Sequence, residues 1–320
     1  MPNGGGVAGY NPPMTPPEPP AGAADSPTPL RMKLAFRPPY AWDELLAFHA
    51  SHTTAGVEQV VGGCYRRTVE VRGVRGWLSV APVPFADALD AVASASLAPV
   101  LPEVTARLRS LFDLDARPEA IAEHLSRDPA LAPLVAKRPG LRLPGCFDGF
   151  EVLVRTVLGQ QISVKGATTL TGRLARAFGD PVATPVDGLD RAFPTAARLA
   201  AVTTDELKAL GIVTARANAI RTVAVAVRDG VVTLGPSPDP EAVIATLVQL
   251  PGIGPWTAHY VAMRALAWPD GFPHGDLVVK RLLGTANPRE LIARAEAWRP
   301  WRGYATMHLW FASFDGLTEI

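Results

Sequence analysis

The sequence predicts an α+β protein, with a small N-terminal α/β domain over residues 32–99 followed by an all-helical domain over residues 100–320. Two observations predict this order. Residues 66–72 (RRTVEVR) alternate polar and apolar side chains, as a half-buried strand does, and residues 74–80 (VRGWLSV) follow after a glycine. Beyond the first domain this alternation fades, and short helical patterns separated by Gly and Pro continue to the C-terminus.

The composition is that of a globular protein. Of the 320 residues, 48% are hydrophobic and 19% are charged, which is ample for a buried core and for more than one domain. The 31 basic and 30 acidic residues give a formal net charge of +1. Because this charge creates no global basic field, any contact with nucleic acid must be local.

The cysteine content and the apolar runs exclude several classes of protein. Cys64 and Cys146 are too few for a four-cysteine zinc or iron–sulfur site, and nothing suggests a secreted disulfide framework. The N-terminus has neither the basic start nor the apolar core of a signal peptide, and no run of 18 or more apolar residues is present to span a bilayer. We therefore expect a reduced, cytoplasmic protein that does not enter a membrane.

The N-terminal elements follow one another in a clear order. Residues 1–31 are dominated by Pro, Gly, Ala and Ser, which predicts a disordered tail. Residues 42–49 have a helical pattern, and the two alternating segments after them predict a hairpin. Together these elements indicate the small α/β domain.

Spacing and capping signals mark the helices of the second domain. Residues 150–158 place apolar side chains at i, i+3 and i+4. Thr203 with Glu206 predicts a capping box, and Asp239 before Pro240 predicts a further helix start. Helices are expected near residues 205–210, 215–228, 240–250, 255–267, 277–283, 289–298 and 301–313.

A glycine-containing turn joins two of these helical patterns within residues 240–267. In the segment 250–258 (LPGIGPWTA), Gly252 and Gly254 flank Ile253. Because glycine has no Cβ, a phosphate can approach the backbone N–H groups closely, and the helix that follows adds its positive dipole end. The segment predicts a phosphate-binding hairpin at these three residues, with a plain αα-corner as the alternative.

Several short motifs together resemble the helix-hairpin-helix DNA glycosylases, and in particular the bacterial 3-methyladenine DNA glycosylase II (AlkA-type) subfamily. In that superfamily the hairpin binds the DNA backbone and an aspartate does the chemistry. The resemblance covers roughly residues 32–314 and is specific as a set. The motifs are the hairpin and, at residues 36–42, 142–146, 155–163, 275–280 and 298–304, FRPPYAW, RLPGC, RTVLGQQIS, GDLVVK and WRPWRGY.

The resemblance implies a monofunctional DNA glycosylase of base excision repair. Such an enzyme excises alkylated purines of the 3-methyladenine and 7-methylguanine type by hydrolysing the N-glycosidic bond. Its partner would be double-stranded DNA containing alkylated bases. The resemblance further implies a monomer, and no cofactor beyond at most a structural monovalent cation at the hairpin. Two alternatives stay open: a non-catalytic helix-hairpin-helix DNA-binding protein, and a bifunctional glycosylase/lyase for oxidised bases.

Asp276 is the expected catalytic carboxylate. It directly precedes the apolar helical run at 277–283, so an N-cap role fits it as well. The resemblance implies that this carboxylate faces the flipped nucleotide, where its charge stabilises the positive charge that builds on the sugar. The subfamily often has a second acidic residue just before it, but this chain has Gly275 after His274. His274 either contributes a proton or simply lies on the loop.

Four aromatic residues are expected to form the base pocket. Trp256 and Tyr260 lie four residues apart on the helix after the hairpin and so share a face, and Trp310 lies on the last helix. On spacing alone, these side chains fit a core as well as a pocket. The resemblance places all three, with Phe48, around the extruded base. Electron-rich aromatic faces attract the positive charge of an alkylated purine.

Three further positions bear on DNA contact and reaction type. Trp256 stands where the lyases of the superfamily carry the lysine that forms a Schiff base, which implies water as the nucleophile. Lys280 is expected one helical turn beyond Asp276, as a surface or phosphate-facing cation. Gln161 stands where the subfamily commonly inserts an apolar wedge, so it is either a polar wedge or a solvated loop residue.

Overall fold

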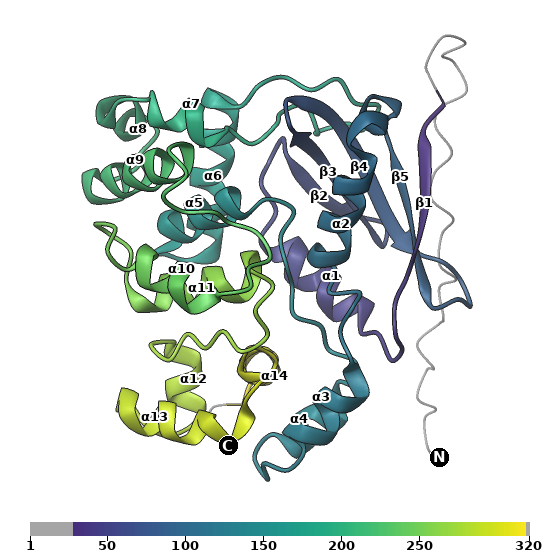
Figure 1. Ribbon diagram of the computed structural model, residues 1–320, viewed down its shortest axis with the longest axis vertical. Coiled ribbons are helices and arrows are strands. Elements are labelled where there is room, and N and C mark those ends of the chain that lie inside the picture. The colour runs from purple at the N-terminus through teal and green to yellow at the C-terminus, as the bar shows by residue number, and fades with distance from the viewer. Residues whose placement is uncertain (1–27, 318–320) are drawn as a thin grey trace, which may run out of the picture.

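A five-stranded antiparallel sheet forms the N-terminal part of the molecule, and the rest is helical (Figure 1), which confirms the α+β class. The structure is a computed structural model that describes residues 28–317, so residues 1–27 of the expected tail lie outside the described residues. The strands lie in the order β1-β5-β4-β3-β2. They are β1 (Leu30–Ala35), β2 (Glu58–Val61), β3 (Cys64–Val71), β4 (Val74–Pro82) and β5 (Ala88–Ala93).

The β3–β4 hairpin forms where the alternating pattern predicts it. Its register pairs Val71 with Val74 across a two-residue turn. The turn residues Arg72 and Gly73 have φ angles of 50° and 77°. Turns with two positive φ angles match the twist of the flanking strands. Arg72 therefore belongs to the turn and not to the strand that was expected to include it.

Strand β1 includes the last two residues of the expected disordered tail. It starts at Leu30 and pairs along its whole length with β5, which lies far along the chain. Leu34 from this strand is buried in the sheet core. Because its order comes from this long-range pairing, local composition misplaces the end of the tail.

The helices α1 (Trp42–Ser51) and α2 (Leu101–Leu111) share one hydrophobic core with the sheet. The 3-10 turn η1 (Ala95–Val100) leads into α2. Helix α2 follows the domain boundary expected at residue 99, yet it packs on the sheet. The core takes alternate residues from the strands, and includes Leu45, Tyr65, Val71, Leu78, Leu89, Leu108 and Phe112.

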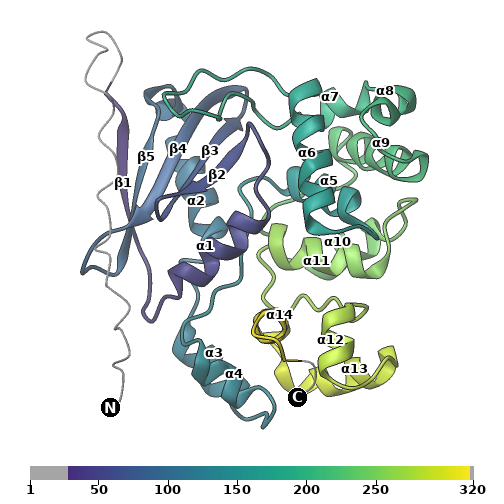
Figure 2. The ribbon, with the colours of Figure 1, turned by 180° about the vertical axis from the view of Figure 1, so that it is seen from behind.

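The remaining helices form two groups (Figures 1 and 2). One group, α5 to α11, lies beside the sheet, and the second joins α3 and α4 to α12, α13 and α14. The helices are α3 (Pro118–Leu125), α4 (Ala132–Lys137), α5 (Gly149–Gly159), α6 (Val164–Phe178), α7 (Ala196–Ala200), α8 (Thr204–Ala209), α9 (Thr214–Arg228), α10 (Pro240–Leu247), α11 (Pro255–Ala265), α12 (Leu277–Leu282), α13 (Pro288–Ala295), the 3-10 turn η2 (Glu296–Trp298) and α14 (Arg302–Phe314).

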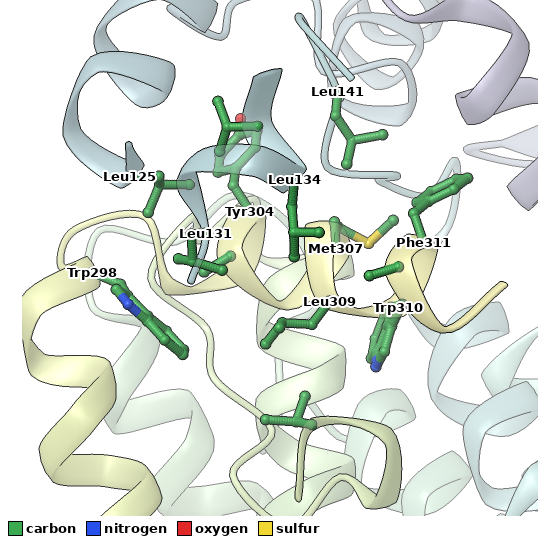
Figure 3. Close-up of a cluster of buried hydrophobic side chains, with 14 of the residues drawn as sticks. Leu125, Leu131, Leu134, Leu141, Trp298, Tyr304, Met307, Leu309, Trp310 and Phe311 are labelled. Atoms are coloured by element: carbon green, nitrogen blue, oxygen red, sulfur yellow. The ribbon is translucent and has the colours of Figure 1, made fainter. Parts of the chain in front are cut away.

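Helix α14 runs through the core of the second group (Figure 3). Its apolar side chains pack against leucines of α3 and α4, so segments from the middle and the end of the chain share one core. The indole N–H of buried Trp298 donates to Asp128 across this core, at 2.7 Å. The labelled members of the cluster include Leu125, Leu131, Leu134, Tyr304, Met307, Leu309, Trp310 and Phe311.

The predicted capping signals are present as hydrogen bonds. Thr203 and Glu206 form a capping box at the start of α8, with both reciprocal bonds made. The carboxylate of Asp239 accepts from Ala242 N at 3.0 Å at the start of α10.

None of the helices in residues 28–317 is long and apolar enough to cross a membrane.

Four charged side chains, three of them buried and Arg155 largely buried, tie the sheet to α5. Arg67 on β3 donates to Glu151 on α5 at 2.6 Å. Arg155, one turn along α5, donates to Glu151 at 3.0 Å and to Glu58 on β2 at 2.6 Å. Burial alone would raise the pKa of Glu58, but Arg155 and Arg67 lower it to about 2. The stability that this carboxylate contributes is therefore present above its ordinary pKa and is lost as the pH falls through about 2.

Candidate functional site

A cavity of about 320 Å³ lies where α1, the two helical groups and the loop after α5 meet. It is mostly apolar, and all four aromatic residues expected for a base pocket line it. Its lining residues are Phe48, His52, Val152, Arg155, Thr156, Gly159, Ile162, Val164, Ala167, Thr168, Thr171, Trp256, Tyr260, Arg264, Val278, Trp310 and Phe314.

Three aromatic rings form a continuous wall of the cavity. Trp256 and Tyr260 stack with ring centroids 5.2 Å apart and an interplanar angle of 12°, as their i, i+4 spacing on α11 allows. The ring of Trp310, from α14, is tilted against Tyr260 at 6.1 Å. Such a wall offers an electron-rich face to a planar or cationic ligand.

Asp276 lies at the margin of this wall and caps α12. Its Oδ1 accepts from the backbone N–H groups of Val278 and Val279 at 2.9 and 3.1 Å. Its two oxygens also accept from the indole N–H groups of Trp256 and Trp310, each at 3.1 Å. An ionised carboxylate has lone pairs for all four donors. The N-cap is therefore present, and two of the aromatic residues fix the same carboxylate beside the cavity.

Gly275 and His274 directly precede Asp276. A Cβ on Gly275 would make only ordinary contact with Trp256, at 3.6 Å, so the glycine is not required by space. The ring of His274 lies edge-on to His259 of α11, with centroids 5.5 Å apart. Burial and His274 lower the pKa of His259 to about 4, so that partner is neutral at pH 7. A role for His274 as a proton donor stays a prediction.

The hairpin between α10 and α11 exposes two glycine N–H groups. Within the described part of the chain, the N–H groups of Gly252 and Gly254 have no acceptor. Ile253 differs, because its side chain is buried and its N–H donates to Leu250 at 3.0 Å. The expected phosphate contact through Ile253 thus lacks a free donor, and the two glycines retain theirs.

The two glycines are not equivalent. Gly252 has a φ of +89°, and a Cβ there would meet the Cβ of Ala219 on α9 at 2.6 Å. Gly254 caps α11 with a φ of −89°, and a Cβ there would have nothing within 4 Å. Only Gly252 is therefore required by the fold itself.

We expect Gly254→Ala to weaken binding to all duplex sequences alike, by about 10-fold, without lowering the melting temperature. The added methyl group would hinder the approach of a phosphate, which carries no base information, to the free N–H groups. Titrations of fluorescent duplexes and thermal melts measure both effects. Gly252→Ala is the comparison, since strain should lower its melting temperature as well. Unchanged affinity in Gly254→Ala would count against a DNA-binding hairpin.

The loop after α5 is fastened to the hairpin and leaves Gln161 exposed. The side-chain amide of Gln160 donates to Gly252 O at 2.9 Å and to Thr257 at 3.2 Å, and Arg216 donates to the Gln160 carbonyl. Gln161, the next residue, has a φ of +57° and an exposed side chain. Its role as a polar wedge stays a prediction, and its position beside the hairpin suits that role.

Metal ligation and the position of Lys280 are the remaining expectations for the site. Residues 28–317 contain no group of three or more His, Cys, Asp or Glu able to hold a metal ion. A structural monovalent cation at the hairpin, held by backbone carbonyl oxygens, stays a prediction. Lys280 lies one turn along α12, half-buried, and has no ion pair with any described residue.

Three polar residues that line the cavity were not predicted as site residues: Arg155, Arg264 and His52. Arg264 follows Tyr260 by four residues on α11, so the same spacing argument would have found it. Its guanidinium donates to Tyr260 Oη, Pro144 O and Gly145 O at 2.9, 3.0 and 2.9 Å, which explains part of the RLPGC motif. Likewise, His52 follows Phe48 by four residues, so the same spacing argument would have found it.

Two protein families match the chain. The AlkA N-terminal domain matches residues 31–148, and the HhH-GPD superfamily base excision DNA repair protein matches residues 154–301. A DNA-3-methyladenine glycosylase 2 of Escherichia coli (strain K12) is 38% identical over 278 residues, which are 87% of this chain and 96% of the relative. A DNA-3-methyladenine glycosylase of Bacillus subtilis (strain 168) is 30% identical over 221 residues, 65% of this chain and 71% of the relative.

Solved structures share the fold. A 3-methyladenine DNA glycosylase from Archaeoglobus fulgidus superposes with a TM-score of 0.74 at 21% identity, covering 88% of this chain and 97% of that one. An 8-oxoguanine glycosylase/lyase of Clostridium acetobutylicum, in complex with double-stranded DNA, superposes with a TM-score of 0.67 at 16% identity. The match covers 92% of this chain and 100% of that one. The chain belongs to the HhH-GPD superfamily of base excision DNA repair proteins, and within it to the family of DNA-3-methyladenine glycosylase 2.

Proposed function

We propose that the protein is a monofunctional DNA glycosylase that releases alkylated purines by hydrolysing the N-glycosidic bond. The observation that carries the proposal is the carboxylate of Asp276, held by four N–H donors at the edge of an aromatic cavity. The 38% identity to a DNA-3-methyladenine glycosylase 2 supports the same activity. The substrate is double-stranded DNA that contains alkylated bases.

The aromatic wall suits a flipped, alkylated purine. Alkylation at N3 or N7 puts positive charge on the base and weakens its bond to the sugar before the enzyme acts. The faces of Trp256 and Tyr260 attract that charge, with Phe48 and Trp310 closing the cavity around the base. Recognition of this kind needs few specific hydrogen bonds, and so accepts more than one alkylated purine.

Asp276 stabilises the charge that forms on the sugar. As the glycosidic bond breaks, electrons leave with the base and the sugar becomes cationic. A fixed, ionised carboxylate lowers the barrier because it is oriented before the reaction starts. Its indole and backbone donors keep it in place, and water adds to the sugar carbon with loss of a proton. The hairpin glycines and Lys280 hold the backbone, while Gln161 enters the space left by the base.

Water is the nucleophile because Trp256 occupies the place of a lyase lysine. Its indole ring is packed against Tyr260 and bonded to Asp276, so no amine is present there. Lys280, the lysine nearest to Asp276 in sequence, lies along α12 beyond the cap. Excision should therefore leave an intact strand with an abasic site.

We expect strand cleavage only after alkali treatment. Methylated duplex is incubated with enzyme and divided, and one half is heated with alkali before strand lengths are resolved. A third sample receives borohydride during turnover, and no covalent protein–DNA adduct should form. Cleavage without alkali, or an adduct that maps to Lys280, would establish the bifunctional alternative. Binding with no abasic sites in any sample would favour the non-catalytic one.

A further inference from the structure

The imidazole of His52 extends the wall of the cavity beyond the four aromatic residues. His52 is the residue that ends α1, and its ring stacks on Phe48 with centroids 4.4 Å apart and an interplanar angle of 20°. It also lines the cavity. The first domain therefore offers a polar ring to the base site as well as an apolar one.

The hydrogen bonds of His52 define which ring nitrogen carries the proton. Its Nδ1 lies 2.8 Å from the carbonyl oxygen of Phe48. A carbonyl oxygen can only accept, so Nδ1 is protonated and donates to it. Ser51 Oγ donates to the same carbonyl at 2.8 Å and also lies 2.8 Å from Nδ1, where its oxygen can share the Nδ1 proton. In the neutral ring, Nε2 is then unprotonated and is an acceptor.

Burial and two guanidinium groups keep this ring neutral. Burial lowers the pKa of His52 to about 4, and the charges of Arg264 and Arg155 act in the same direction. Arg155 also donates to the backbone carbonyl of His52, which fixes the end of α1 against α5. The ring is thus held in one protonation state and one place.

His52 Nε2 has a free lone pair where other polar groups of the cavity are engaged. The guanidinium of Arg155 is paired with Glu58, and that of Arg264 donates to carbonyl and hydroxyl oxygens. The hydroxyl of Thr156 donates to the helix behind it. Among the described residues that line the cavity, His52 Nε2 is the one nitrogen acceptor, and it has no hydrogen-bond partner and is not fully buried.

We propose that His52 is a specificity-determining residue whose Nε2 accepts a hydrogen bond from an N–H or NH2 group of the flipped purine. The inference rests on the proposed function and adds to it a preference for bases that carry an N–H or NH2 donor. 3-Methyladenine keeps an exocyclic amine and 7-methylguanine keeps a ring N–H and an amine, so both satisfy the acceptor. Unsubstituted purine has no N–H donor and leaves Nε2 unpaired. A site that hydrogen-bonds its substrate discriminates against the analogue lacking the group.

The test compares wild type with His52→Phe and His52→Gln on two duplexes, one methylated and one carrying unsubstituted purine. We expect His52→Phe, which keeps a ring against Phe48, to slow release of 3-methyladenine by about 10- to 100-fold. Release of unsubstituted purine should stay within about twofold of wild type. His52→Gln should restore part of the rate on 3-methyladenine, because its amide oxygen can reach the place of Nε2.

His124→Phe is the matched control, since its imidazole is not among the residues that line the cavity and lies 2.9 Å from the carbonyl oxygen of Ala297. Its rates should equal those of wild type on both duplexes. Equal 3-methyladenine rates for wild type and His52→Phe would overturn the inference, as would a fall of the same size on both duplexes. Wild type that releases no 3-methyladenine at all would instead refute the proposed function, so the two failures are distinguishable.

Discussion

Replacing Asp276 by Asn is expected to abolish base release, by at least about 10³-fold, while binding to lesion-containing DNA persists. The amide keeps the shape of the side chain, and its oxygen can still accept from Val278 and Val279. What is lost is the negative charge that stabilises the sugar cation. The new NH2 group also faces the indole N–H of Trp256, which removes one of the orienting bonds.

The control for this variant is another aspartate with the same capping role. Asp239 caps α10 through Ala242 N and is not among the residues that line the cavity. Asp239→Asn should release base at the wild-type rate. Parallel thermal melts check that both variants fold. If Asp276→Asn released base at the wild-type rate, its carboxylate would be only a helix cap.

Replacing Glu151 by Gln is expected to lower the free energy of unfolding by about 3–5 kcal/mol. Glu151 is 2% exposed and accepts from both Arg67 and Arg155. The substitution leaves the buried Arg67 and the largely buried Arg155 with one carboxylate, Glu58, between them, and the new NH2 group faces a guanidinium donor. Because Arg155 also fixes the end of α1, the loss should loosen the sheet domain from α5.

Urea or thermal unfolding at pH 7 measures this effect. The matched control is Glu123→Gln, which removes an ion pair with Arg127 whose side chains are 77% and 68% exposed. Exposed pairs of this kind contribute about 0–1 kcal/mol. If Glu151→Gln lowered the free energy of unfolding no more than Glu123→Gln, the buried cluster would add little to stability.

Local signals predict most of the helical fold. The capping box at Thr203 and the Asp239–Pro240 start give α8 and α10 correctly, because such caps depend only on neighbouring residues. Strands β1, β2 and β5 were not predicted. Strand β1 is ordered through its pairing with β5, and no local pattern in a short edge strand specifies a distant partner.

Part of the candidate site was predictable because it depends on residue spacing within one helix. Trp256 and Tyr260 share a face because they are four residues apart on one helix, and the structure stacks their rings. Spacing cannot show that the indole of Trp310 meets Asp276, since α12 and α14 are brought together only by tertiary packing. The buried side chain of Ile253 follows likewise from packing of the hairpin in the core of its helical group.

The most direct test of the account is release of free base from methylated duplex DNA under single-turnover conditions, with wild type and Asp276→Asn side by side. Chromatography of the soluble fraction identifies and quantifies the bases. We expect wild type to release 3-methyladenine and 7-methylguanine, and Asp276→Asn to bind the same duplex without releasing either. Wild type that binds methylated duplex but releases no base, or equal release by both proteins, would contradict the central claim that Asp276 drives excision of alkylated purines.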